Sequence, residues 1–576
     1  MLKFTPNALK ILKARYLLKD DDGRVIETPA EMFRRVSRTV AEAERLYDEN
    51  VLFWEDKFYE LLSSLRFLPN SPTLMNAGKE IGQLAACFVL PVEDSMKGIF
   101  DTLKNAALIL QSGGGTGFSF SRLRPKEDVV HSTGGLSSGP VSFMSIYNRA
   151  TDVIRQGGAR RGANMGILRV DHPDIVEFAR SKRDCYELSN FNISVAVTDE
   201  FMNALKKDEK YELRNPRTGK SAGFIRAADV FNEIVESAWL TGDPGLVFID
   251  RINRDNPTPQ FGEIESTNPC GEQPLLPYEA CILGSLNLSI YVGNSVLESD
   301  AGSPYVNFDA LGNDVRTAVR FLDDCIDVNK YPLQDIEQMH KGNRKIGLGV
   351  MGWADMLVLM GIPYVSKKAL KLAEDVMKFI NTTSKDESEH LGQLKGLFPN
   401  FYGSVYDRDD MPRVRNATTT TVAPTGTLST IADCSSGIEP YFALSYRRYV
   451  LETELHEVNR YFFSVAKMMG FYSKDLEDEV ISNGTLRGIK NVPRKIKKLF
   501  KTAHEINYRI HIEMQAVFQK YTDNAVSKTI NMPRSAKKED IADAFMMAYE
   551  KGCKGITVFR YGGKKAGTMV RFSDVD

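Results

Sequence analysis

Short apolar segments that alternate with amphipathic ones constrain the fold of this chain more than any other feature. The stretches "PGLVFI" (244–249), "ACILGSLNLSI" (280–290) and "KIGLGVMGW" (345–353) have the length and composition of buried strands. Between such stretches lie helical patterns, for example "DVRTAVRFLDDCIDV" (314–328). Strands that alternate with helices predict an α/β architecture with a mainly parallel sheet or barrel.

The N-terminal segment is predicted to be helical instead. "TPAEMFRRVSRTVAEAERLY" (28–47) opens with a Thr-Pro cap signal, and its apolar residues recur at helical spacing. We therefore expect a helical region over residues 1–65, a main domain over 66–565 and a short tail over 566–576. No repeat or linker divides the chain after residue 70.

One further helix is predicted over residues 95–111. Its apolar stripe consists of Met96, Ile99, Phe100, Leu103, Ala107 and Leu110. Such a stripe suits either a core helix or a dimer interface, and the spacing leaves both open.

Charge and hydropathy exclude several classes of protein. The formal net charge of −1 argues against binding nucleic acid, and the basic run at 493–501 is typical of a solvated helix face. No run of about 18 apolar residues and no signal-peptide pattern occur. We expect a cytoplasmic chain without nucleic-acid or membrane partners.

The seven cysteines are scattered and odd in number, so a disulfide framework is not expected. They stand at positions 87, 185, 270, 281, 325, 434 and 553. No C-x-x-C pair and no H-E-x-x-H helix occur, so no metal site is predicted. Any special cysteine is expected to act as a thiol.

The motif "NPCGE" (268–272) is the first candidate site. If this segment is extended, Asn268, Cys270 and Glu272 present an amide, a thiol and a carboxylate on one side. A carboxylate beside a thiol raises the pKa of the thiol, which disfavours a thiolate nucleophile and suits a source of hydrogen atoms. The spacing is equally compatible with a structural thiol.

The second candidate is "APTGTLSTIADCSSG" (423–437), where a threonine-rich strand runs through a small-residue turn into a helix. Free backbone N–H groups at such a turn can bind an anion, although a plain helix cap would look the same. The stretch "GGGTGF" (113–118) has Phe118 where a dinucleotide-binding fingerprint needs glycine.

Together these segments resemble the catalytic subunit of ribonucleotide reductase, closest to the dimeric class II enzymes that depend on adenosylcobalamin. The matching stretches are "LPNSPTLMNAG", "LAACFVLPVEDS", "GGGTGFSFSRLRP", "SSGPVSFM", "RQGGARRGANMGIL", "NPCGE…YEACILGSLNLS", "APTGTLSTIADCSSGIEP" and "SKTINMP…GITVFR". The resemblance implies a ten-stranded α/β barrel of two antiparallel five-stranded halves, with a finger loop at its centre and a small helical N-terminal region.

The resemblance also implies roles for individual residues. Cys270 would carry a transient thiyl radical that takes the 3′-hydrogen of the ribose, Glu272 would be the general base and Asn268 would hold the substrate hydroxyls. Cys87 and Cys281 would form the reducing pair. Substrate contacts are expected at Ser71, Ala86, Gly115, Pro424, Thr425, Gly426, Thr427 and Leu428. Effector contacts (dNTP or ATP) are expected at Asp94, Ser95, Arg124, Gln156 and Arg160.

The late strand "GITVFRYGG" indicates the source of the radical. It has no adjacent tyrosine pair of the kind that relays a radical from a separate metallo-subunit, and "RYGGKKAG" is not a glycyl-radical segment. This favours adenosylcobalamin. The alternatives are the large subunit of a class I reductase and a regulatory relative with a dead site, which the intact catalytic set disfavours.

Both ends of the chain depart from the family pattern. The sequence as given starts almost directly at the helical region, so no N-terminal ATP-cone domain is expected in it, and "GTMVRFSDVD" has no cysteine pair to re-reduce the active site. Either the sequence is truncated before such a pair, or a thioredoxin-like reductant or a separate tail protein is expected to take its place. The dimeric enzymes that this chain resembles act on diphosphates. We therefore expect the substrate to be a ribonucleoside diphosphate and the assembly to be a homodimer.

Overall fold

The computed structural model describes residues 3–130, 134–156, 160–184, 187–297, 302–450 and 453–563. Helices of the first half of the chain are α1 (Pro6–Ile11), α2 (Pro29–Ala41), α3 (Val51–Ser63), α4 (Ser71–Asn76), α5 (Met96–Gln111), α6 (Pro140–Val153), α7 (Ile175–Arg180), α8 (Asp199–Lys207), α9 (Ala227–Thr241) and α10 (Ile249–Arg254). Those of the second half are α11 (Phe308–Val328), α12 (Gln334–Asn343), α13 (Trp353–Leu359), α14 (Lys367–Lys395), α15 (Gly426–Ile431), α16 (Arg460–Met468), α17 (Lys474–Asn483), α18 (Arg494–Leu499), α19 (Tyr508–Gln519) and α20 (Lys538–Glu550).

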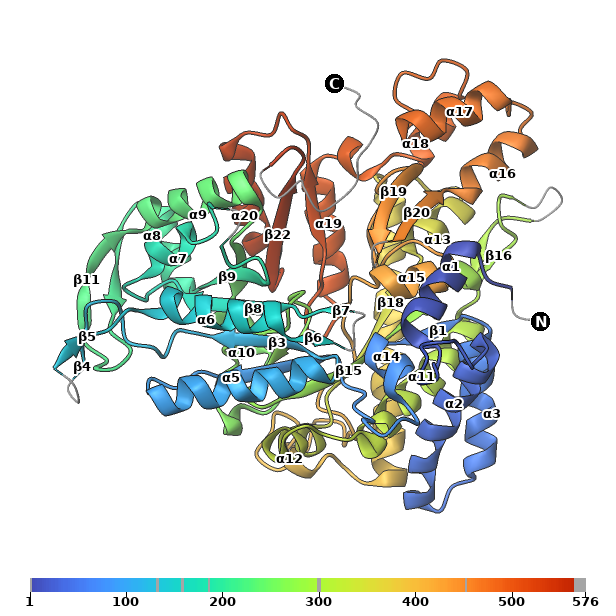
Figure 1. The fold of residues 1–576 in the computed structure, drawn as a ribbon. Coiled ribbons are helices and arrows are strands. Elements are labelled where there is room, and N and C mark those ends of the chain that lie inside the picture. The colour runs from blue at the N-terminus through green and yellow to red at the C-terminus, as the bar shows by residue number, and fades with distance from the viewer. Residues whose placement is uncertain are drawn as a thin grey trace.

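One half of the barrel consists of neighbouring parallel strands. In spatial order they are β2 (Cys87–Pro91), β3 (Gly115–Ser119), β8 (Asn164–Arg169), β9 (Phe191–Val197) and β12 (Gly245–Phe248). These strands are almost wholly buried, as parallel strands covered on both faces must be. Helices α5 and α6 pack together on the outside of this half (Figure 1).

The other half is also parallel. It contains β15 (Ala280–Asn287), β18 (Ile346–Met351), β21 (Thr529–Met532) and β22 (Gly555–Arg560). The threonine-rich segment 418–422 lies between β18 and the residues before β21. Its Thr420 pairs with Leu348 of β18, and its Val422 pairs with Val526. The short strand β1 (Phe67–Pro69) adds an antiparallel edge to β15.

The halves meet through antiparallel pairs, β15 with β2 and β12 with β22. With the 418–422 segment between β18 and the residues before β21, the strands therefore form a closed barrel of two antiparallel halves. The predicted α/β barrel is confirmed, and so is the helical N-terminal region of α1, α2 and α3.

The N-terminal helices dock onto α11 and α14 through a buried ion network. Arg320 of α11 donates to both carboxylate oxygens of Glu44 at 2.6 and 2.7 Å, and the ammonium of Lys395 lies 3.0 Å from the same carboxylate. Glu44 and Lys395 have side chains that are 0% exposed, so each charge depends on its partner. The α2 and α3 helices lie beside α11 in Figure 1.

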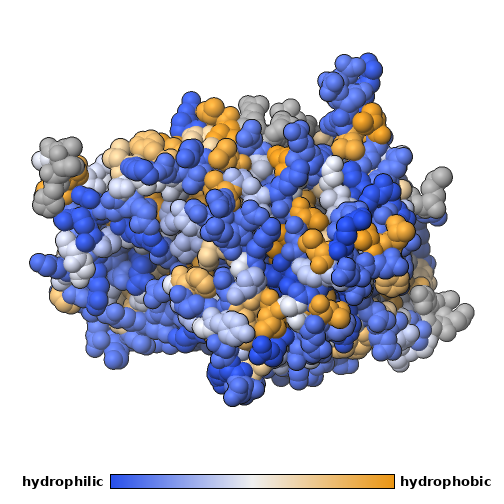
Figure 2. Space-filling view, turned by 90° about the horizontal axis from the view of Figure 1, so that it is seen from below, coloured by the Kyte–Doolittle hydropathy of each residue, from blue (hydrophilic) through white to orange (hydrophobic). Residues whose placement is uncertain are grey.

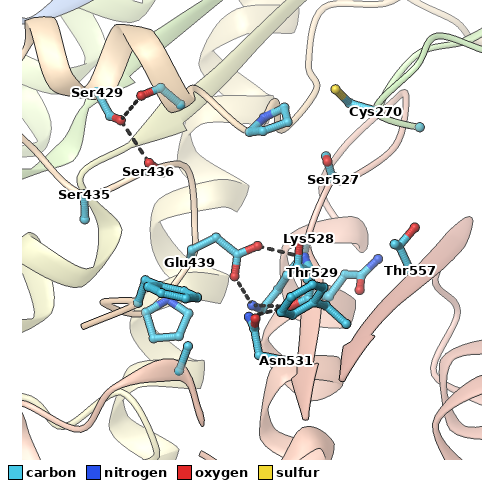
Figure 3. A pocket seen from close by; sticks show the side chains of 18 of the residues that line it. Cys270, Ser429, Ser435, Ser436, Glu439, Ser527, Lys528, Thr529, Asn531 and Thr557 are labelled. Carbon is cyan, nitrogen blue, oxygen red and sulfur yellow. Dashed lines mark hydrogen bonds and ion pairs between the residues drawn. The ribbon is translucent and has the colours of Figure 1, made fainter. Parts of the chain in front are cut away.

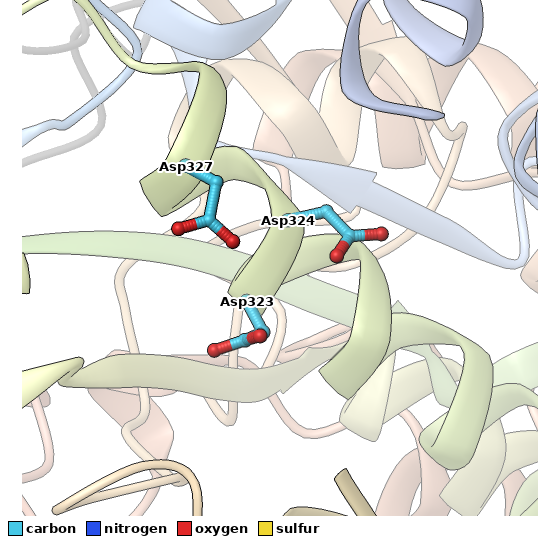
Figure 4. A group of neighbouring side chains, drawn as sticks. All are labelled: Asp323, Asp324 and Asp327. Atoms are coloured by element: carbon cyan, nitrogen blue, oxygen red, sulfur yellow. The ribbon is translucent and has the colours of Figure 1, made fainter. Parts of the chain in front are cut away.

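Three aspartates of α11 gather next to this network (Figure 4). Ligand oxygens of Asp323, Asp324 and Asp327 lie within 4.8 Å of one another, a spacing that could suit a cation. However, Arg344 pairs with Asp323 at 2.9 Å and with Asp327 at 2.7 Å, and Lys395 pairs with Asp324. Protein cations already neutralise this cluster, and we assign it a structural role.

The surface seen from below carries hydrophobic groups dispersed among hydrophilic ones (Figure 2). Among the described residues, no helix has the length and apolar character needed to cross a membrane.

Candidate active site

The "NPCGE" motif forms the tip of a hairpin inside the barrel. Strands β13 (Ser266–Thr267) and β14 (Pro274–Leu275) pair antiparallel, and the Gly271 N–H donates to the Asn268 carbonyl at 3.0 Å. Gly271 has a φ of 81°, a left-handed conformation that glycine adopts without strain. Residues 268–272 therefore form a tight turn and not the extended segment that would place all three side chains on one side. The turn exposes Cys270 while Asn268 and Glu272 are buried.

Both barrel halves hold this finger in place. On β3, a Cβ added to Gly117 would lie 1.8 Å from the Thr267 carbonyl oxygen, so only glycine allows the finger to approach so closely. On the opposite side, the Glu272 carbonyl accepts hydrogen bonds from the Thr421 hydroxyl at 2.9 Å and from the Ala525 N–H at 3.0 Å. The position of the finger is thus defined by hydrogen bonds and by tight packing.

The two other thiols lie directly across a strand pair. Cys87 of β2 and Cys281 of β15 are register partners in the antiparallel ladder. Directly opposite residues place their Cβ atoms about 4.5–5.5 Å apart, close to the separation of about 3.5–4.5 Å that a disulfide needs. Both thiols are reduced and buried, and burial raises the pKa of each well above its ordinary value. Neutral thiols are the form that can donate hydrogen atoms.

Asn268 links the finger to this pair. Its side-chain N–H donates to the Cys87 sulfur at 3.1 Å, and its side-chain oxygen accepts from the Gln273 N–H at 3.0 Å. The side-chain amide of Asn268 is therefore held through both its nitrogen and its oxygen.

Glu272 is buried behind the finger tip with a side chain poised for proton transfer. Burial raises the pKa of Glu272 to about 7, against a smaller lowering by the Asn268 amide. Its Oε2 atom is buried and has no hydrogen-bond partner among the described residues. A carboxylate with an open acceptor and a pKa near neutrality is suited to general-base work.

Cys270 lines a large cavity of about 1240 Å³. Figure 3 shows its sulfur at the edge of this cavity, near Ser527 and across from the Glu439–Lys528 pair. The predicted phosphate turn reaches the same cavity through Pro424, Gly426 and Thr427. Two segments far apart in the sequence therefore meet at one cavity.

The phosphate turn has the expected strand–turn–helix form. Thr425 caps α15 with a φ of 56°, and its hydroxyl accepts the Gly437 N–H at 2.8 Å. A Cβ added to Gly426 would meet nothing within 4 Å, so the turn faces open space. Arg15 of the N-terminal region also lines the cavity, and its guanidinium lies 3.5 Å from the Thr427 hydroxyl.

The remaining predicted substrate residues do not line this cavity. Ser71 is hydrogen-bonded to the Tyr16 hydroxyl at 2.8 Å, and Leu428 is buried in α15. Gly115 donates its N–H to the Ala86 carbonyl at 2.8 Å, and a Cβ on Gly115 would lie 3.0 Å from Pro269. Gly115 therefore lies against the finger at Pro269, and Ala86 is hydrogen-bonded to Gly115.

Sequence reasoning missed several polar groups of the cavity wall. Lys528 is buried and pairs with Glu439, while its ammonium lies 3.0 Å from the His511 ring. Asp355 accepts from the Tyr441 hydroxyl and from the Ser435 N–H, each at 2.6 Å, and burial raises its pKa to about 6. Glu439 and Lys528 belong to "SSGIEP" and "SKTINMP", which were noted as motifs without assigned roles. Cys434 lines the cavity too.

Three of the predicted effector residues, Asp94, Ser95 and Arg124, lie at the N-terminal end of α5. Arg124 donates to Asp94 at 2.9 Å, and the Ser95 hydroxyl caps α5 by accepting the Gly98 N–H at 3.0 Å. Gln156 and Arg160 lie on the paired strands β6 (Arg155–Gln156) and β7 (Arg160–Arg161), but their side chains are outside the described residues. Cys185 and the tail 566–576 are also outside them.

The apolar stripe of α5 divides between core and surface. Ile99 and Leu110 are buried, whereas Met96 and Phe100 remain 62% and 45% exposed. Val153 of the neighbouring α6 is 72% exposed. The core alternative therefore applies to the buried part of the stripe, and the interface alternative stays a prediction for the exposed part.

Comparison with known proteins identifies the family. A model of the ribonucleotide reductase barrel domain matches residues 85–559, and a model of the ribonucleotide reductase all-alpha domain matches residues 2–82. The chain belongs to the ribonucleotide reductase family.

Relatives with curated names agree with this membership. The chain is 51% identical to a vitamin B12-dependent ribonucleoside-diphosphate reductase of Thermoplasma acidophilum, over 97% of this chain and 79% of that protein. It is 46% identical to one from Mycobacterium tuberculosis, over 98% and 80%. Among solved structures, the Actinobacillus ureae class Id ribonucleotide reductase alpha subunit shares the fold, with a TM-score of 0.79 at 21% identity over 98% of this chain and 99% of that chain.

Proposed function

We propose that this chain is an adenosylcobalamin-dependent ribonucleoside-diphosphate reductase. The observation that carries the proposal is the meeting of three thiols around one finger: Cys270 exposed at its tip in the cavity, and Cys87 paired with Cys281 at its base. The names of the relatives from Thermoplasma acidophilum and Mycobacterium tuberculosis support the cofactor and the diphosphate substrate.

The cavity beside Cys270 fits a large cofactor together with a substrate. Its volume of about 1240 Å³ exceeds the roughly 300–1,000 Å³ of pockets that hold one drug-sized ligand. The wall away from the phosphate turn, with Tyr446, Phe559 and Tyr561, would hold the cofactor. When bound, adenosylcobalamin supplies the radical that takes the hydrogen atom of the Cys270 thiol.

The finger residues then divide the chemistry on the ribose. The Cys270 thiyl takes the 3′-hydrogen atom, and Glu272 accepts the proton of the 3′-hydroxyl through its open Oε2. Asn268 orients the substrate hydroxyls from a side chain already fixed between Cys87 and Gln273. These roles agree with the burial and hydrogen bonding of the three side chains.

The cysteine pair supplies the electrons. The 2′-hydroxyl leaves as water, Cys87 and Cys281 together give up two hydrogen atoms, and their sulfurs join in a disulfide. Cys270 then returns the hydrogen atom to C3′ and is again the thiyl, and Glu272 returns its proton to the 3′-oxygen. The substrate thereby becomes the 2′-deoxynucleotide, so atoms and electrons balance. A thioredoxin-like reductant or a separate tail protein then restores both thiols.

The proposal also assigns the residues that bind the substrate and the effectors. The turn from Pro424 to Leu428 binds the diphosphate, with Ser71, Ala86 and Gly115 nearby. Deoxynucleotide or ATP effectors bind around Asp94, Ser95, Arg124, Gln156 and Arg160 and select the substrate. The exposed residues of α5 and α6 form the interface of a homodimer. Coupling of this kind is worth about 1–3 kcal/mol.

One assay separates this function from the large subunit of a class I enzyme. Purified chain is mixed with a ribonucleoside diphosphate, adenosylcobalamin and a dithiol, without other proteins, and deoxynucleoside diphosphate is measured. Formation of product supports the proposal. Its absence, with activity restored by a metallo-subunit, would favour the class I alternative.

A further inference from the structure

Cys281 lies between a thiol and a buried lysine. Its register partner on β2 is Cys87, and on its other side β15 runs parallel to β18, with Ile282 opposite Ile346. Lys345, which precedes Ile346, is therefore the neighbour of Cys281, and the Cys281 thiol donates to the Lys345 carbonyl at 3.5 Å. Strand register alone therefore places Cys87 of β2, Cys281 of β15 and Lys345, just before β18, side by side.

The Lys345 ammonium is held by a matched carboxylate. It donates to Glu279 at 2.7 Å, and both side chains are 1% exposed. Glu279 also accepts from the Asn343 amide and from the Leu276 N–H. A buried ion pair is costly to desolvate and persists only when its geometry is good, so the ammonium is fixed beside Glu279. Because register neighbours of parallel strands project on the same face of a sheet, the Lys345 side chain lies on the face that carries Cys281.

The two thiols of the pair differ in the charges around them. Burial has the largest effect on the pKa of Cys281 and raises it. The positive charge of Lys345 lowers this pKa, and the charges of Glu279 and Glu272 raise it by smaller amounts. At Cys87, the nearby charge of Glu272 adds to the effect of burial and raises the pKa further. Of the two sulfurs, Cys281 is the one beside a cation.

The two thiols also differ in position. Cys87 is 3% exposed and contacts the finger through Asn268, whereas Cys281 is 0% exposed and lies behind it against β18. A reductant that approaches past the finger therefore meets the sulfur of Cys87 first.

We propose that Lys345 sets the direction of disulfide reduction, so that the external dithiol attacks the sulfur of Cys87 and Cys281 is the leaving group. This inference rests on the proposed function, which forms the disulfide. The attacking thiolate bonds to Cys87, the Cys87–Cys281 bond breaks, and its electron pair stays on Cys281 beside the ammonium. The second thiol of the dithiol, once deprotonated, displaces Cys87, leaving an oxidised dithiol and two cysteines that take up protons. A lower pKa makes a thiol the better leaving group.

The attacked sulfur can be identified directly. The full chain is oxidised chemically to the Cys87–Cys281 disulfide, exposed briefly to glutathione, quenched in acid, alkylated and analysed by peptide mass spectrometry. We expect glutathione on Cys87 and the alkyl group on Cys281. Glutathione mainly on Cys281, or equally on both, would overturn the proposal. Because the oxidation is chemical, this result does not depend on reductase activity.

Variants test the role of the charge. Lys345→Gln combined with Glu279→Gln removes both charges and keeps a hydrogen-bonding pair, while Lys345→Arg keeps the cation. The double variant should slow dithiol reduction of the disulfide by roughly two- to fivefold, because the opposing charge of Glu279 is removed together with that of Lys345. Lys345→Arg should retain most of the rate. Equal rates in all three chains would contradict the inference.

Two further readouts separate this role from a structural one. Cys87, Glu272, Glu279 and Lys345 are the titratable groups that act on Cys281. In the double variant, the pH at which the reduction rate is half-maximal should be higher than in the native chain. A misfolded chain would instead show a smaller extent of reduction at every pH, without such a shift. Product from one turnover of the pre-reduced holoenzyme should be unchanged. Failure of that turnover in the native chain would instead contradict the proposed function.

Discussion

The side-chain amide of Asn268 donates a hydrogen bond to the sulfur of Cys87 at 3.1 Å. One residue of the finger thus contacts the cysteine pair while its neighbour two positions on, Cys270, faces the cavity. The thiol proposed to carry the radical and the two thiols proposed to supply electrons are therefore held in one relative geometry by a single turn. Substrate bound above that turn would meet both.

Replacing either reducing cysteine should separate radical formation from turnover. In Cys87→Ser and Cys281→Ser, Cys270 and the cavity remain, so a radical should still form, but no thiol pair can supply two electrons. We expect loss of multiple turnover, measured as deoxynucleotide released per chain. Cys325→Ser is a matched control, because Cys325 is a buried thiol of α11 outside the site. Normal multiple turnover in either active-site variant would refute the pairing.

The buried Glu272 carboxyl should control the pH dependence of the reaction. Its pKa is raised to about 7, and only the deprotonated form can act as a base. The value of kcat/KM should therefore rise with pH through about 7, and Glu272→Gln should lower kcat by about 10²–10⁴-fold and abolish this rise. A pH profile of Glu272→Gln that still shows the same rise would assign it to another group.

The same carboxyl should affect stability in the opposite sense. Because the pKa in the folded chain lies above its ordinary value of 4.5, its contribution to stability is present below that value and is lost as the pH rises through about 7. Glu272→Gln should therefore unfold at an equal or higher denaturant concentration than the native chain at pH 8. A marked loss of stability at that pH would contradict the buried, unpaired carboxyl.

The close approach of β3 and the finger predicts that Gly117→Ala displaces the hairpin. The added Cβ would lie 1.8 Å from the Thr267 carbonyl oxygen, which is backbone and cannot rotate away. We expect a large loss of kcat. Gly426→Ala is the comparison, since its Cβ meets no protein atom and should leave the melting temperature unchanged. Equal melting temperature and activity in Gly117→Ala and the native chain would exclude this packing.

The ion network beneath the N-terminal helices predicts a strong effect of Lys395→Met. Removing this ammonium leaves Glu44 and Asp324 buried without their shared partner, which typically costs about 3–5 kcal/mol. Lys97→Met is the exposed control, because its ion pair with Asp101 lies on the surface and should change stability by less than about 1 kcal/mol. Denaturant unfolding measures both. Similar values for the two variants would show that the network does not anchor the helical region.

Much of the fold was predictable because its signals are local. Alternating apolar and helical segments predicted the barrel, and the cap at Thr28 marked the start of α2, where its hydroxyl accepts the Glu31 N–H. The turn before α15 was predicted from small residues that follow a threonine-rich strand, and Thr425 occupies it. Each inference needed only a short window of sequence.

The site was less accessible to such reasoning. Pro269 and Gly271 are compatible with both an extended strip and a tight turn, and the burial of Glu272 inside the barrel favours the turn. The pairing of Cys87 with Cys281 came from family resemblance, because strand register between distant segments leaves no local signal. Lys345 was missed for the same reason, since only the register of β15 and β18 makes it a neighbour of Cys281.

The central claim is that the thiol of Cys270 becomes the radical that starts the reaction. Freeze-quench electron paramagnetic resonance of the chain with adenosylcobalamin, a ribonucleoside diphosphate and a deoxynucleotide effector tests it directly. The native chain should give a sulfur-radical signal within one turnover, and Cys270→Ser, which should bind the cofactor normally, should give neither signal nor product. The same signal in Cys270→Ser, or product formation by that variant, would contradict the account.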